Sequence, residues 1–187
     1  MMRALMLRRT TDAYVTLFRY LNTLMPNFKP RAIKSDFEEA QMNAWRIVYH
    51  RAKVEGCLWH YAVAVFNKAK QLGLSELIRT EPEVASIVRS LSALPLLPAE
   101  GIEDGLIELG WEARDKGWML ELRPLFQYME TEWIPKAQIL SVKGSDNRTN
   151  NISESANRSF NRVVRISRPN SYQVIREYST AVHTCSN

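Results

Sequence analysis

The sequence predicts an α/β protein whose sheet is interrupted by an all-helical insertion. Over residues 1–72, short apolar segments alternate with segments of helical apolar period, which is typical of a sheet with helical crossovers. From 73 to 140, helical patterns follow one another with no strand pattern between them. Residues 141–187 begin with turn residues and continue with one more amphipathic helix, so we expect them to return to the core and end in a tail.

The first strand and helix are predicted from two adjoining apolar patterns. RALMLRR (3–9) is short, apolar and bounded by arginine, as a strand often is. A helix should follow it, capped by Thr10, Thr11 or Asp12. Its apolar residues recur at helical spacing: Tyr14, Leu17, Phe18, Leu21 and Leu24. Pro26 should end it, because proline lacks an amide donor and restricts the residue before it.

Two further strand and helix pairs follow. RAIKS (31–35) is a predicted short strand, and DFEEAQMNAWRIVYH (36–50) a predicted helix. The predicted buried stripe of that helix is Phe37, Ala40, Ala44, Ile47 and Val48. KVEGCLWH (53–60) is the next predicted strand, and a helix should run over 61–71.

The second half of the chain is predicted to be helical. Residues 73–140 should hold three or four, punctuated by Pro82, Pro95, Pro98, Gly117, Pro124 and Pro135. A helix over 151–165 would place Ile152, Ala156, Phe160, Val163 and Val164 on one side. Its other side would be polar and mostly basic: Glu154, Asn157, Arg158, Asn161, Arg162 and Arg165. A further short helix is expected over 171–182.

Composition indicates a folded intracellular protein. The chain has 187 residues, 45% of them hydrophobic, and no apolar run approaches the roughly 18 residues that a membrane span needs. The apolar run near residue 1 is too short for a secretory signal. Cys57 and Cys185 are far apart and form no disulfide framework, which fits a reducing compartment.

Charge is distributed unevenly around a net value of +5. Residues 1–35 carry seven lysines or arginines against one acid, and residues 141–178 carry seven against three. Residues 72–134 hold twelve acids and five bases, so we expect this part to face away from any polyanion. The basic segments fit contacts with phosphate groups of a nucleic acid, and they fit a merely solvated basic surface equally well.

Two acids stand at predicted helix starts. Glu154 lies three residues after Asn151, and Glu38 three residues after Ser35, which is the spacing of a capping box. The alternative to helix capping is that acids at these helix starts bind a metal ion. Asp36 ends a strand where open α/β sheets bind their ligands, and Glu154 from a later helix could share a divalent cation with it. A two-metal site would need at least one more bridging acid.

Cys57 and His60 form a C-x-x-H pair, which can supply half of a tetrahedral zinc site. His183 and Cys185 could supply the other half, although their spacing is tight. A buried cysteine at a strand end, with His60 hydrogen-bonded in the core, is the interpretation we favour over zinc.

Several segments together resemble the transposase domain of the Mutator-like element (MULE) transposases. They are ALMLRRTTDAYVTLFRYL, IKSDFEEAQMNAWR, VEGCLWH, LSALPLLP, PLFQYMETEWI and RTNNISESANRSFNR. Each segment alone is weakly specific, but their order and spacing also resemble the family, over about residues 3–165.

The resemblance implies a ribonuclease-H-like core with a DDE triad of acids, interrupted by a helical insertion before the final glutamate. Asp36 matches the second acid, Glu154 the third, and Cys57 with His60 the C-x-x-H signature, in a structural or supporting role. It also implies Mg²⁺ or Mn²⁺ at Asp36 and Glu154, a nuclear location, transposon ends and target DNA as partners, and self-association of the full-length form. The bases expected to contact DNA phosphates are Lys143, Arg148, Arg158, Arg162 and Arg165.

The chain departs from the family pattern at its start. The first catalytic aspartate and the first two core strands would lie upstream of residue 3, so we expect a partial fold that binds metal weakly and neither cleaves nor joins DNA alone. A non-catalytic DNA-binding or protein-interaction module is the alternative function. A third alternative is an incomplete product that does not fold stably.

Overall fold

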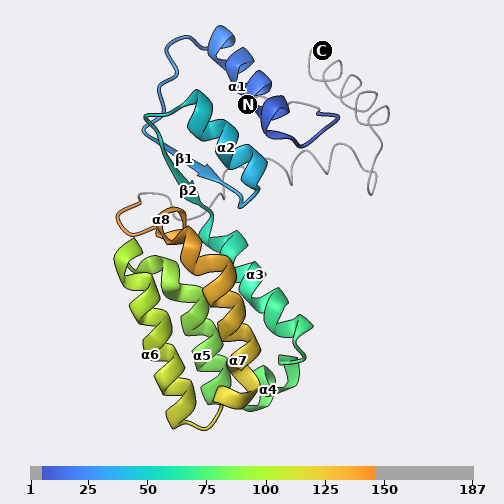
Figure 1. Cartoon of the computed structure of the whole chain (residues 1–187), viewed down its shortest axis with the longest axis vertical. Coiled ribbons are helices and arrows are strands. Elements are labelled where there is room, and N and C mark those ends of the chain that lie inside the picture. Colours follow the sequence, from blue (N-terminus) through green and yellow to red (C-terminus); the bar gives the residue numbers. More distant parts are fainter. Residues whose placement is uncertain (1–5, 146–187) are drawn as a thin grey trace, which may run out of the picture. The chain divides into compact units, whose positions relative to one another are not determined.

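The structure, a computed structural model, describes residues 6–145, which form mainly helices beside a small sheet (Figure 1). Helix α1 spans Thr11–Leu24 and begins as predicted, with the Thr10 side chain accepting a hydrogen bond from the Ala13 amide at 3.3 Å. It ends just before Pro26. A strand was predicted over residues 3–9, but residues 6–9, the part of that segment that the structure describes, form no strand.

The sheet consists of two parallel strands in the described residues, β1 (Ala32–Ser35) and β2 (Lys53–Gly56), in register from Ala32↔Lys53 to Ser35↔Gly56. Helix α2 (Glu39–Val48) connects them, giving a β-α-β unit. Mixed α/β is therefore the correct fold class, although about 70% of the structure is helical.

The predicted buried stripe of α2 is confirmed only in part. Ala44 of that stripe is buried, but Ile47 of the stripe is 53% exposed, and Met42, which lies outside the stripe, is buried. The helix begins at Glu39 rather than Asp36, and its Trp45 ring stacks on Phe18 of α1 with 3.5 Å between the ring centroids. Stacking two large aromatic rings between α1 and α2 turns Ile47 toward solvent.

Helix α3 spans Leu58–Gln71, so it begins three residues earlier than predicted, and the strand before it ends at Gly56 instead of continuing to residue 60. The helices that follow are α4 (Ser75–Thr80), α5 (Pro82–Ala93), α6 (Ile102–Asp115), α7 (Met119–Tyr128) and α8 (Ala137–Leu140). Short 3₁₀ turns cover Leu94–Leu96, Ala99–Gly101 and Ile134–Lys136, and a π-helical turn covers Met129–Trp133. Helix α7 continues through Pro124, which was predicted to interrupt it.

One hydrophobic core joins α3 to the helices after it. It includes Tyr61, Val65, Ile87, Val88, Leu91, Leu106, Leu122, Leu125, Met129 and Trp133. The Tyr61 hydroxyl, fully buried, donates to the Leu91 carbonyl oxygen at 2.7 Å, which satisfies the polar end of a large core side chain. Helices α5, α6 and α7 lie alongside one another in Figure 1.

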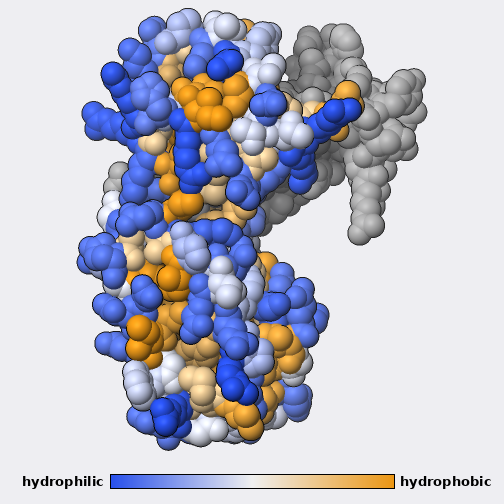
Figure 2. All heavy atoms as spheres, in the orientation of Figure 1, coloured by the Kyte–Doolittle hydropathy of each residue, from blue (hydrophilic) through white to orange (hydrophobic). Residues whose placement is uncertain are grey.

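The surface in Figure 2 shows hydrophobic side chains in separate patches among hydrophilic ones. Within residues 6–145, no helix combines the length and apolar character that crossing a membrane requires.

Candidate functional site

Asp36 and His60 meet at the carboxyl edge of the sheet. Asp36 directly follows β1, and His60 lies in the first turn of α3, which begins just after β2. The Asp36 Oδ1 atom is 3.0 Å from His60 Nδ1, and the two side chains are 52% and 38% exposed. Because parallel strands end at the same edge, two residues 24 positions apart in sequence are brought into contact there.

The capping interpretation of the segment before α2 is wrong. The Ser35 hydroxyl donates to Gln41 Oε1 at 2.8 Å, and Glu38 makes no side-chain cap bond at the start of α2. Glu38 instead accepts a hydrogen bond from the Tyr14 hydroxyl of α1 at 3.0 Å. The helix begins three residues after Asp36, so that carboxylate is not needed to cap α2 and lies against His60.

Cys57 is completely buried between β2 and α3, which agrees with the favoured interpretation of a buried cysteine at a strand end. His60, by contrast, is partly exposed beside Asp36 rather than enclosed in the core. Among residues 6–145, no three His, Cys, Asp or Glu side chains are grouped so that they could hold a metal ion. Of the predicted Mg²⁺ or Mn²⁺ ligands, the described residues contain Asp36; Glu154, like His183 and Cys185, lies outside them.

Phe37 anchors the backbone next to Asp36. Its ring lies over Gly56, where a Cβ atom would come within 2.2 Å of Phe37 Cζ, and its edge meets the Trp133 ring with 4.9 Å between centroids. Glycine at 56 therefore makes room for the aromatic ring that ties the Asp36 turn to the helical core.

Substituting Gly56 with alanine should lower the free energy of unfolding by about 1–3 kcal/mol, because the new methyl group displaces the Phe37 ring from a packed position. Urea denaturation followed by circular dichroism measures the effect. Gly110→Ala is the control: its Cβ would meet only ordinary contacts of 3.6 Å or more, and alanine favours the α6 interior by up to about 1 kcal/mol. Equal destabilisation of both variants would contradict the packing role of Gly56.

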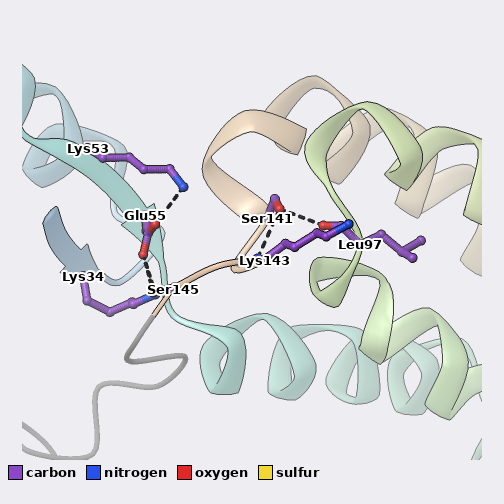
Figure 3. Close-up of polar contacts among 7 residues, drawn as sticks. All are labelled: Lys34, Lys53, Glu55, Leu97, Ser141, Lys143 and Ser145. Carbon is purple, nitrogen blue, oxygen red and sulfur yellow. Dashed lines mark hydrogen bonds and ion pairs between the residues drawn. The ribbon is translucent and has the colours of Figure 1, made fainter.

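Glu55 is a buried carboxylate that sequence reasoning missed. Its Oε2 atom accepts from Lys34 Nζ at 2.9 Å and from the Ser145 hydroxyl at 2.7 Å, while Oε1 lies 2.8 Å from Lys53 Nζ (Figure 3). Burial alone would raise the pKa of Glu55, but the hydrogen bonds from Lys53, Lys34 and Ser145 outweigh it and lower that pKa to about 2. The available signal was an acid inside an apolar strand, which needs a partner when buried.

The chain returns to the sheet through residues 141–145. Val142 donates its amide proton to the Pro95 carbonyl at 2.8 Å, and the Ser141 hydroxyl donates to the Leu97 carbonyl at 2.7 Å. Ser145 then reaches Glu55 of β2, ninety positions earlier in the sequence (Figure 3). Lys143 in this segment is exposed, whereas Arg148, Arg158, Arg162 and Arg165 lie outside the described residues.

Scans of protein-family models, curated proteins and solved structures each returned no match for this chain. A proposal for its function therefore depends on three structural features: the carboxyl edge of the sheet, the Asp36–His60 pair, and the return of the chain to Glu55.

Proposed function

We propose that the chain carries part of a ribonuclease-H-like DDE transposase domain of the MULE type, acting on DNA in the nucleus. The observation that carries the proposal is the path of the chain. It leaves the sheet at Gly56, passes through the helices from α3 to α8, and returns to β2 at Ser145. Such a path is expected where a helical insertion divides a ribonuclease-H-like core.

The position of Asp36 supports the same proposal. It is a partly exposed carboxylate at the carboxyl end of β1, and β1 pairs directly and in parallel with β2. The segment that follows Ser145 contains Glu154 nine positions later, so Glu154 is separated from the sheet by a short stretch of chain. The proposed metal ligands are therefore Asp36 and Glu154.

In the complete enzyme, Mg²⁺ or Mn²⁺ would supply an activated attacking oxygen and stabilise the leaving oxygen during DNA cleavage and strand transfer. Residues 6–145 offer this ion one candidate carboxylate, Asp36, and no group of three ligands. Exposed Lys143 is the described member of the proposed set of phosphate contacts, which also includes Arg148, Arg158, Arg162 and Arg165.

Mn²⁺ binding tests the assignment of Asp36. Wild-type protein should bind Mn²⁺ weakly, and Asp36→Asn should weaken binding at least fivefold, because an amide replaces the charged ligand. Titration followed by the electron paramagnetic resonance signal of free Mn²⁺ measures the affinity. Asp104→Asn, which removes an acid from the first turn of α6, should leave the affinity unchanged.

A non-catalytic DNA-binding module is the second candidate function. The 3.0 Å contact between Asp36 Oδ1 and His60 Nδ1 favours it, because the candidate metal ligand is already engaged by another side chain. This function requires DNA binding that falls with salt and is indifferent to Asp36→Asn and to Mn²⁺. Undetectable Mn²⁺ binding by a protein that retains DNA binding would select this function and exclude the catalytic assignment of Asp36.

A further inference from the structure

A groove of about 450 Å³ lies at the other end of the sheet from Asp36. Its walls come from the segment after α1 and from the turn between α2 and β2, and they include Pro30 and Ala52, which stand just before the two strands. Its polar lining residues are Asn22, Lys29, His50 and Arg51. The described structure therefore places this groove at the amino ends of β1 and β2.

The groove has an excess of positive charge. None of its lining residues is acidic, and Lys29 and Arg51 are exposed. Neither side chain forms an ion pair with any residue between 6 and 145. Helices α1 and α2 end nearby, and each carboxyl end contributes roughly half a negative charge that is screened within one turn. The positive charges of Lys29 and Arg51 exceed the partial negative charges of the two helix ends. Arg31, close by in sequence, adds a third positive charge.

The groove also presents an aromatic wall. Phe28 is 44% exposed and meets the Tyr49 ring edge-on, with 5.7 Å between centroids. Tyr49 is only 8% exposed, and its hydroxyl has no hydrogen-bond partner among residues 6–145. That hydroxyl oxygen is itself buried, so the aromatic surface that a ligand meets at this wall is the exposed Phe28 ring.

We propose that this groove binds the phosphodiester backbone of DNA through Lys29 and Arg51. The proposal rests on the proposed function, which makes DNA the partner, and adds a contact surface separate from Asp36 and Lys143. The four residues of β1 span about 13 Å, which corresponds to roughly four base-pair steps of duplex. One duplex is long enough to reach both ends of the sheet. Contacts to the backbone fix the position of DNA without reading its sequence.

Salt-dependent DNA binding tests the groove. The affinity of the full chain for a labelled duplex is measured by fluorescence anisotropy over a range of salt concentrations, for wild type and for Lys29→Ala/Arg51→Ala. The slope of log affinity against log salt should fall by about 1.8, because two phosphate contacts of about 0.9 each are lost. At low salt, the affinity should drop about tenfold.

The matched control is Lys70→Ala/Arg89→Ala, which also removes one exposed lysine and one exposed arginine, from α3 and α5. This control should change the slope of log affinity against log salt by less than about 0.3, because it removes no phosphate contact. An unchanged slope in the groove variant, or an equal fall in the control, overturns the groove while leaving DNA as the partner. A wild-type protein that binds no DNA overturns both proposals.

Competition with inorganic phosphate distinguishes a DNA site from a site for a free anion. At matched ionic strength, phosphate should displace the duplex no better than chloride does. Stronger displacement by phosphate that disappears in Lys29→Ala/Arg51→Ala would show that the groove takes a free phosphate group, and would overturn the assignment to DNA.

Discussion

Replacing Glu55 with glutamine should lower the free energy of unfolding at pH 7 by about 3 kcal/mol, because it leaves the mostly buried Lys34 ammonium without its countercharge. Urea denaturation followed by circular dichroism measures the change. Lys53→Gln is the control at the same carboxylate. The Lys53 side chain is 57% exposed, so removing its ion pair should cost less than about 1 kcal/mol.

Joint removal of the buried pair separates charge burial from packing. Lys34→Met/Glu55→Leu replaces both ions with apolar side chains of similar volume, and such replacements are often neutral or stabilising. The double variant should therefore be more stable than Glu55→Gln. If it is equally unstable, the contribution of Glu55 comes from its hydrogen bond with Ser145 rather than from pairing with Lys34.

The stabilisation from Glu55 should also depend on pH in a defined direction. The pKa of Glu55 is about 2 in the folded protein, below its ordinary value of 4.5. The unfolded chain therefore binds this proton first as pH falls. The stabilisation is fully present above pH 4.5 and disappears between pH 4.5 and 2, on the order of 3 kcal/mol in total. A wild-type minus Glu55→Gln difference that stays constant over this range would contradict the low pKa.

Local patterns were sufficient for much of the described fold. Helix α1, its Thr10 cap and its end before Pro26 follow from side chains within a few residues, as does strand β1. The predicted start of α3 was wrong because Cys57, Leu58 and Trp59 form a short apolar run that fits a strand or a helix equally well.

Features that depend on distant residues could not be predicted. The packing of α2 involves Phe18, which stacks on Trp45 from another helix. Glu55 accepts hydrogen bonds from Lys34 and Ser145, which lie 21 and 90 positions away in the sequence. The pairing of Lys34 with Glu55 follows only from the parallel register of the strands. At the candidate site, the place of Asp36 at a strand end follows from sequence, but its contact with His60 does not.

Trp133→Ala should have the other large effect on stability, a loss of about 3–5 kcal/mol in the free energy of unfolding. The Trp133 ring is buried and meets Phe37, Tyr61 and Tyr128 edge-on, with 4.9, 4.8 and 6.3 Å between centroids. Truncation removes a large buried ring and leaves a cavity among three aromatic side chains. Thermal and urea denaturation both measure the loss.

Trp133→Phe is the matched variant, because it keeps an aromatic ring. The Trp133 indole N–H forms no well-aligned hydrogen bond among residues 6–145, although its proximity to Tyr128 acts to lower the pKa of that hydroxyl, so its removal should cost little. The loss should stay below about 1.5 kcal/mol. A loss as large as that of Trp133→Ala would mean that the indole N–H, rather than the ring, is the important group.

Coupling between Trp133 and Gly56 tests whether Phe37 links the Asp36 turn to the helical core. Gly56→Ala pushes the Phe37 ring away from β2, and Trp133→Ala opens space beside that ring. The ring can then move into the vacated volume, so the double variant should lose at least about 0.5 kcal/mol less than the sum of the two single losses. Additive losses would mean that the two substitutions act on independent parts of the protein.

Mn²⁺ affinity measured on the same variants would then show whether the position of Asp36 depends on this aromatic contact, because Asp36 is the residue directly before Phe37.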